Sequence, residues 1–101
     1  MPTSQHLVQV ASTFELEVLQ PGANSAIVTH CASIRIRNTS ENKVLFIAPQ
    51  NSAYALPIAP GGAWGIDCTD VRVELRTVLI ALIKDHDAPT IVERIFNHSL
   101  L

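Results

Sequence analysis

The stretch RNTSENKVLFIAP, residues 37–49, places a run of polar, turn-forming residues directly before a short apolar segment. A second break of the same kind, APGGAW, follows at residues 59–64. Asparagine, serine, proline and glycine each favour turns for a different backbone reason, and short apolar segments between closely spaced turns are typical of β-strands. This part of the chain therefore predicts short strands that are joined by tight turns.

The same periodicity extends toward the N-terminus. In LVQVASTFELEVLQ, Phe14, Leu16 and Val18 alternate with Glu15 and Glu17. A period of two predicts a strand whose apolar side chains lie on the buried face and whose carboxylates lie on the solvated face. Further strands are expected in AIVTHCASIRIRN, which reads as one long strand, and in KVLFIA, YALPI, AWGID and VRVELRTVLIALI.

The last of these segments changes character along its length. From Val78 to Ile83 it is apolar at every position, so both faces of the strand are apolar there. Strands of this kind are covered on both sides, which indicates a position such as a subunit interface.

The C-terminal tail follows a different spacing. Ile91, Ile95 and Phe96 fit a helical pattern, and Thr90 with Glu93 has the spacing of a capping box. We expect a short C-terminal helix or arm.

Together these elements predict an all-β fold. Six to eight short strands without alternating helices indicate an antiparallel β-sandwich or small barrel, with a jelly-roll-like topology. A chain of 101 residues is long enough for one hydrophobic core, so residues 1–101 are expected to form a single domain.

The composition excludes some function classes and favours one. The net charge is −2 and the seven Lys and Arg residues form no basic stripe, so no direct nucleic-acid binding is expected. The longest strongly apolar run, residues 78–83, is far shorter than the ~20 residues that span a bilayer. The first ten residues lack the features of a secretory signal, so we expect the protein to be made in the cytoplasm.

With 48% apolar and only 16% charged residues, the chain has surplus apolar surface, which predicts self-association.

Reactive residues form no recognisable catalytic, cofactor or metal site. The four histidines lack metal-ligand spacing, and Cys31 and Cys68 are interpreted as reduced, buried side chains. Asp85, His86 and Asp87 fit a solvated loop at a helix entry. Glu15 and Glu17 could form a glycosidase-type pair, but keeping a strand face soluble is the simpler role. We expect no enzymatic activity and no cofactor.

Tyr54 and Trp64 flank the PIAPGG turn and could present an aromatic platform to a sugar or another ligand. The alternative to a structural protein is therefore a carbohydrate- or small-ligand-binding β-sandwich module. An enzyme of cupin-like form would additionally need a bound metal.

Residues 34–67, IRIRNTSENKVLFIAPQNSAYALPIAPGGAWGID, resemble a pattern found in small virion proteins of tailed bacteriophages. The resemblance lies in the order of strand, polar turn, short strand, variable turn and a Pro-Gly turn before the next strand. The positions that carry it are Asn38, Ser40, Val44, Ile47, Leu56 or Ile58, Pro60 and Gly61. Two segments depart from the pattern, since APQNS stands where a glycine pair is usual and RTVLIALI replaces alternating small residues.

This resemblance implies a capsid decoration (cement) protein, or a related head or tail protein, located in the virion. Such a protein bridges subunits, so the expected partners are itself, as a trimer or dimer, and the major capsid protein. The residues expected at these interfaces are Leu7, Val8, Val78, Ile80, Leu82, Ile91, Ile95 and Phe96.

Overall fold

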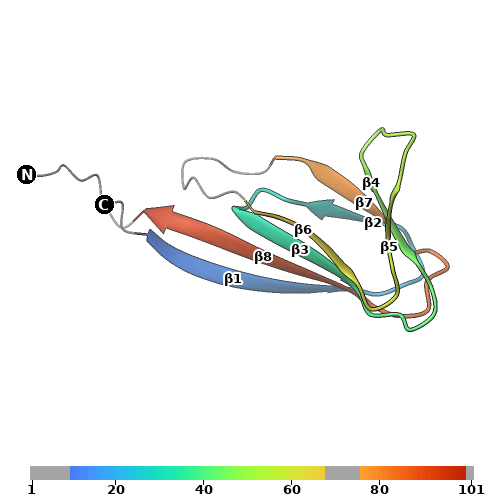
Figure 1. Ribbon diagram of the computed structural model, residues 1–101. Helices are drawn as coiled ribbons and strands as arrows, with labels where there is room; N and C mark the ends of the chain where they lie inside the picture. Colours follow the sequence, from blue (N-terminus) through green and yellow to red (C-terminus); the bar gives the residue numbers. More distant parts are fainter. Residues whose placement is uncertain (1–9, 68–75, 100–101) are drawn as a thin grey trace, which may run out of the picture.

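The computed structural model describes residues 10–67 and 76–99, which form eight strands and no helix (Figure 1). The strands are β1 (Val10–Leu19), β2 (Ser25–Val28), β3 (Ser33–Asn38), β4 (Leu45–Pro49), β5 (Leu56–Ile58), β6 (Ala63–Asp67), β7 (Val78–Leu82) and β8 (Thr90–Ser99). The expected interface residues Leu7 and Val8, the segment 71–75 and Cys68 lie outside the described residues.

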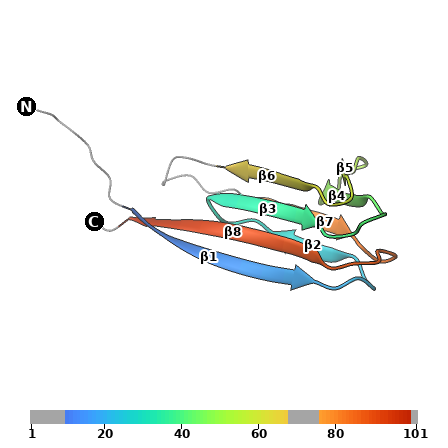
Figure 2. The same cartoon turned by 60° about the horizontal axis from the view of Figure 1, so that its bottom comes forward.

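The strands form two antiparallel four-stranded sheets. Sheet A has the order β1-β8-β3-β6 and sheet B the order β2-β7-β4-β5. Four pairs are nested one inside the next, β4 with β5, β3 with β6, β2 with β7 and β1 with β8. The chain thus runs as one long hairpin that is rolled into two facing layers, which is the jelly-roll arrangement (Figure 2). The predicted β-sandwich of jelly-roll type is confirmed.

The hydrophobic core lies between the two sheets. Sheet A contributes Ile34, Ile36 and Val92, each at most 1% exposed. The inward residues of sheet B and its flanks that complete the core are Ile27, Leu45, Ile47, Ile58, Leu79, Ala81 and Ile83. Burial of these branched apolar side chains from both layers is the main force that holds the sandwich together.

Two of the predicted turns have the backbone geometry that their residues favour. Gly62 N donates to Ala59 O at 2.8 Å, and Gly61 has φ +74°, as the third position of a type II turn after Pro60 requires. Between β4 and β5, Ser52 N donates to Pro49 O at 3.0 Å around Asn51, whose φ is +65°.

The polar run after β3 is organised by one buried side chain. Asn38 is 2% exposed, and its Nδ2 donates to Lys43 O at 2.8 Å and to Ile58 O at 3.0 Å. Its Oδ1 accepts from Ser40 N at 3.1 Å and lies 2.9 Å from His86 Nε2. Asn38 therefore ties the β3–β4 turn to the end of β5 and to the β7–β8 turn.

The long strand expected over residues 26–38 is interrupted. The chain leaves sheet B after Val28 and enters sheet A at Ser33, with His30 at φ +27° in the corner. Thr29 fixes this corner, because its Oγ1 accepts from Thr77 N at 2.9 Å and its N donates to Thr77 O at 3.1 Å.

The prediction of a short C-terminal helix is wrong. Residues 90–99 form β8, the strand that lies between β1 and β3. Ile91 and Ile95 are four residues apart, a spacing that puts two side chains on the same face of a helix and also on the same face of a strand. Pairing with two neighbouring strands decides between them, and the capping-box interpretation of Thr90 and Glu93 falls with the helix.

Candidate interaction surfaces

The outer face of sheet B is apolar at every outward strand position. Ile27, Leu79, Ala81 and Ile47 point into the core, so their neighbours along each strand point outward. These outward residues are Ala26, Val28, Phe46, Ala48, Pro57, Val78, Ile80 and Leu82. The register forms continuous rows across the sheet, for example Pro57 beside Phe46 and Phe46 beside Leu82.

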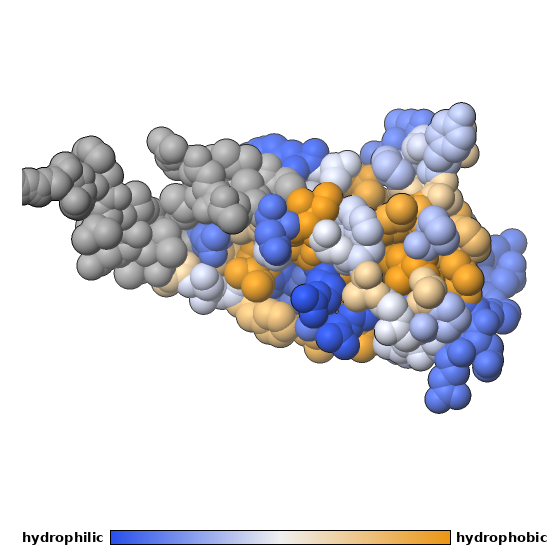
Figure 3. Space-filling model, viewed as in Figure 1, coloured by the Kyte–Doolittle hydropathy of each residue, from blue (hydrophilic) through white to orange (hydrophobic). Residues whose placement is uncertain are grey.

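Several of these side chains are substantially exposed. Val28 is 44% exposed, Phe46 43% and Leu82 40%. Figure 3 shows hydrophobic residues reaching the molecular surface in several places, with hydrophilic residues between them. An apolar sheet face without charged residues at its strand positions is typical of a surface that another protein covers.

The outer face of sheet A is divided into an apolar half and a charged half. The apolar half consists of Phe14, Leu16 and Val18 on β1 with Ile91 and Ile95 on β8. The charged half, described next, lies along β3.

On the charged half, Arg35 lies opposite Glu93, and Arg37 Nε is 2.9 Å from Glu93 Oε1. A groove of about 530 Å³ runs where the two halves meet, lined by Phe14, Ile95, Arg35, Glu93, Trp64 and Asp67. At one side of it Gly65 approaches β3 closely, since a Cβ there would lie 2.8 Å from Ile34 O.

The orientation of β1 is the reverse of the prediction. Phe14 is 62% exposed, Leu16 54% and Val18 47%, so the alternating apolar set lies outside the sandwich. Glu15 and Glu17 lie on the inner side, at the open edge between β1 and β2. A single strand with a period of two cannot reveal which of its faces meets the core.

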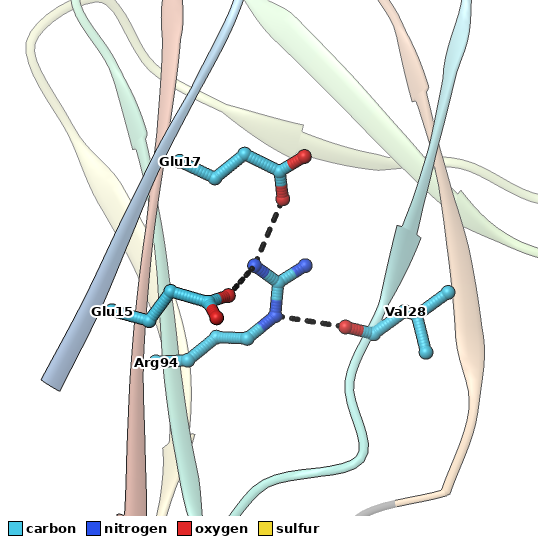
Figure 4. A network of polar contacts seen from close by, with 4 residues as sticks. All are labelled: Glu15, Glu17, Val28 and Arg94. Carbon is cyan, nitrogen blue, oxygen red and sulfur yellow. Dashed lines mark hydrogen bonds and ion pairs between the residues drawn. The ribbon is translucent and has the colours of Figure 1, made fainter. Parts of the chain in front are cut away.

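A buried arginine on β8 accounts for the inward carboxylates (Figure 4). Arg94 is 6% exposed, and its Nη1 donates to Glu17 Oε1 at 2.8 Å and to Glu15 Oε1 at 3.1 Å. Its Nε donates to Val28 O at 2.9 Å, across the gap to sheet B. The guanidinium thereby links both sheets at this edge, and a buried charge of this kind needs such partners.

The contacts of Arg94 also bear on whether Glu15 and Glu17 act as a glycosidase-type pair. Glu15 and Glu17 bind one guanidinium, which gives both a structural role. A groove of about 480 Å³ beside them is also lined by His30, which is exposed. In the part of the chain that the structure describes, no group of three or more His, Cys, Asp or Glu residues is placed to hold a metal ion.

The two aromatic residues of the alternative interpretation lie in different settings. Trp64 is on the inner side of β6 and packs against the core cluster. Tyr54 is 84% exposed in the β4–β5 turn. The groove that Trp64 lines does not include Tyr54.

The loop that holds Asp85, His86 and Asp87 joins β7 to β8 and contains no helix. His86 lies against Asn38, and Lys43 Nζ donates to Asp85 O at 2.9 Å. These contacts hold the loop against the β3–β4 turn.

Most of the described residues that were expected at interfaces do face outward. Val78, Ile80 and Leu82 lie on the outer face of sheet B, and Ile91 and Ile95 on that of sheet A. Phe96 differs, because it is on the inner side of β8 and packs against the core.

The sequence interpretation missed Phe14, Leu16, Val18, Val28 and Phe46 as surface residues, although all five are at least 43% exposed. For Phe14, Leu16 and Val18 the alternation with glutamates predicts burial, and only the pairing of β1 with β8 and the contacts of Arg94 reveal their outward position.

Among residues 10–67 and 76–99, no helix has the length and apolar character to cross a membrane. Comparisons of the chain with protein-family models, with curated proteins and with solved structures give no match.

Proposed function

We propose that this protein is a non-enzymatic structural protein of a bacteriophage virion, which decorates or cements the capsid by bridging neighbouring shell subunits. The observation that carries the proposal is the outer face of sheet B, whose outward strand positions are all apolar. A small domain in water has no use for such a face unless another molecule covers it.

Two further features support this role. The jelly roll is a fold of many viral capsid proteins, although it also occurs in lectins and cupins, so this support is an analogy of fold. The polar residues that carry the resemblance to phage virion proteins, Asn38 and Ser40, are both 2% exposed and hold the turns together. Asn38 and Ser40 thus set the shape of the loops and supply no reactive group, which fits a structural role.

The proposed mechanism is burial of apolar surface against the shell. Phe46 and Leu82 lie side by side at the exposed centre of the sheet B face. Replacing either with lysine would place an ammonium group at the contact, where it would lose its hydration without gaining a partner.

The test is co-sedimentation of the purified protein with capsids of the phage that encodes it. We expect the unaltered protein to bind and to raise the temperature at which the capsids disrupt, whereas Phe46→Lys and Leu82→Lys bind at least about tenfold more weakly. Tyr54→Lys is the control at an exposed aromatic residue, because Tyr54 lies in the β4–β5 turn and outside the strands of that sheet. Absence of capsid binding by the unaltered protein would contradict the proposal, and a tryptophan-fluorescence response to glycans would favour the ligand-binding alternative.

A further inference from the structure

We infer that the outer edge of β1 is a self-association site, at which β1 of a second copy pairs antiparallel and joins two copies of sheet A into one continuous sheet. The inference goes beyond the proposed function, because it concerns the self-association that the apolar composition predicts and names the strand that carries it. It requires no viral shell, so it can be tested on the purified protein alone.

The four edge strands of the sandwich differ in length and composition. Sheet B ends in β2, of four residues, and in β5, of three residues including Pro57. Sheet A ends in β6, of five residues, and in β1, of ten. Short length, proline and charged residues are the usual protections against pairing with another chain. β1 is long and contains no proline, and its two charged residues, Glu15 and Glu17, are bound by Arg94 of β8. Among the described edges, β1 is the one suited to accept a long strand.

The outward side chains of β1 are large, apolar and exposed. Its outward residues Phe14, Leu16 and Val18 are more exposed than is usual for large apolar residues, at 62%, 54% and 47%. A strand that is paired beside β1 would bring its own outward residues into direct and diagonal contact with them. A second copy supplies the same residues, so that Phe14 of each copy can lie directly against Phe14 and diagonally against Leu16 of the other.

Strands β1 and β8 extend beyond the end of β3. Pairing of β3 with β8 ends at Ser33 and Ile95, whereas β1 and β8 remain paired as far as Val10 and Ser99. Among the residues that the structure describes, 10–13 and 96–99 therefore form a two-stranded ribbon beyond β3 (Figures 1 and 2). Isolated two-stranded ribbons are marginally stable in water, and a third strand from a second copy would stabilise this one.

The charges on the inner side of β1 select the register. In the first possible register, Phe14 lies opposite Phe14 of the second copy, residues 10–18 are paired, and Glu15 lies opposite Thr13 of the second copy. In a second register, Leu16 lies opposite Leu16 of the second copy, which places Glu15 opposite Glu17. In a third register, Phe14 lies opposite Leu16 of the second copy, which places Glu15 opposite Glu15. Like charges that are directly opposite destabilise a strand pair, so the first register is favoured. It also lays the ribbon of each copy along the sandwich portion of the other.

The main experiment is a charge swap at the predicted symmetry centre, measured by light scattering. We expect the unaltered protein to dimerise, whereas Phe14→Lys and Phe14→Glu each weaken dimerisation by more than about tenfold, because two like charges meet in every homodimer. A mixture of the two variants is expected to form a heterodimer. Because Phe14 is 62% exposed, neither variant creates a cavity, and circular dichroism checks that both are folded.

A matched control separates this site from the proposed capsid-binding face. Phe46→Lys also replaces an exposed phenylalanine, but on sheet B, and should dimerise normally while losing capsid binding. The inference fails if the unaltered protein is monomeric, if Phe14→Lys dimerises as well as the unaltered protein, or if the mixture stays monomeric. Each of these results leaves the capsid-binding test of Phe46→Lys to be judged separately.

Disulfide trapping tests the register itself. In a Cys68→Ser background, Phe14→Cys is expected to form an intermolecular disulfide, since directly opposite residues of antiparallel strands have Cα atoms about 4.5–5.5 Å apart. Ile95→Cys is the matched control on the neighbouring strand, opposite Phe14. Its counterpart in the second copy would be three strand spacings away, about 14 Å, which is beyond disulfide reach. Trapping by Ile95→Cys in place of Phe14→Cys would overturn the proposed pairing.

Discussion

Strands β1 and β3 lie on either side of β8 in the same sheet, and both alternate apolar with charged residues. In β3 the alternation has the expected orientation, with Ile34 and Ile36 at most 1% exposed and Arg35 outside. In β1 it is reversed, with Phe14 outside and Glu15 inside. The difference teaches that a period of two identifies a strand, whereas the neighbours of that strand decide which face is buried.

The cause of the difference is position in the sheet. β3 is an inner strand of sheet A, and its inward residues join the core cluster shared with sheet B. β1 is at the edge, where Arg94 from β8 reaches toward Val28 O and needs carboxylates beside it. Four predictions test this contrast, in order of decreasing effect on stability.

The largest effect is expected at the centre of the β3 inner face. Ile36→Lys would bury an ammonium group without a partner at a site that is 0% exposed, and we expect a loss of more than about 4 kcal/mol in the free energy of unfolding. Urea denaturation measures this loss. Retention of near-normal stability would mean that Ile36 does not lie in the core.

A smaller loss is expected where the β3 inner face ends in a polar residue. Asn38→Leu keeps a side chain of similar size but leaves Lys43 O and Ile58 O without their donor. We expect the free energy of unfolding to fall by about 3 kcal/mol. Asn38→Asp, which keeps the acceptor that faces Ser40 N but turns a carboxylate oxygen toward Lys43 O and Ile58 O, should recover none of this loss in the same denaturation experiment.

On the inner face of β1, the corresponding polar contacts are those of Glu15 and Glu17 with Arg94 of β8. Arg94→Ala removes the donors to Val28 O and leaves Glu15 and Glu17 close together without a cation, so we expect a loss of about 2–3 kcal/mol. The double variant Glu15→Gln with Glu17→Gln, in the Arg94→Ala background, should restore part of it by removing the carboxylate repulsion. If Arg94→Ala alone is neutral, the explanation for the reversed orientation of β1 is wrong.

The smallest effect is expected on the outer side of β1. Leu16→Lys changes a residue that is 54% exposed and lies opposite Glu93, so the free energy of unfolding should change by less than about 0.5 kcal/mol. Measurement at a dilution at which the protein is monomeric isolates this effect from self-association. A loss comparable to that of Ile36→Lys would show that Leu16 is buried after all.

Local patterns were sufficient to predict the fold class. The turns at Pro60–Gly61 and at residues 37–43, and the inward Ile34 and Ile36, follow from rules that involve a few neighbouring residues. Val78, Ile80 and Leu82 are expected at an interface because the strand is apolar on both faces, and they do lie on its outer side. The apolar run itself does not distinguish them from Leu79 and Ala81, which point into the core.

The errors arose where contacts between distant residues decide the structure. Thr29 breaks the strand expected over residues 26–38 through hydrogen bonds to Thr77, 48 residues away. Arg94 holds Glu17 across 77 residues, and β8 is a strand because it pairs with both β1 and β3. Neither a charge that belongs inside nor the partner of a strand can be recognised from a short window of sequence.

The central claim is that the apolar residues outside the two sheets are surfaces for association. Sedimentation equilibrium of the unaltered protein tests it most directly, with the 11.0 kDa chain as the reference mass. We predict a species of at least twice that mass that dissociates when Phe14 is replaced with lysine. A single monomeric species at every concentration up to the solubility limit would contradict the account.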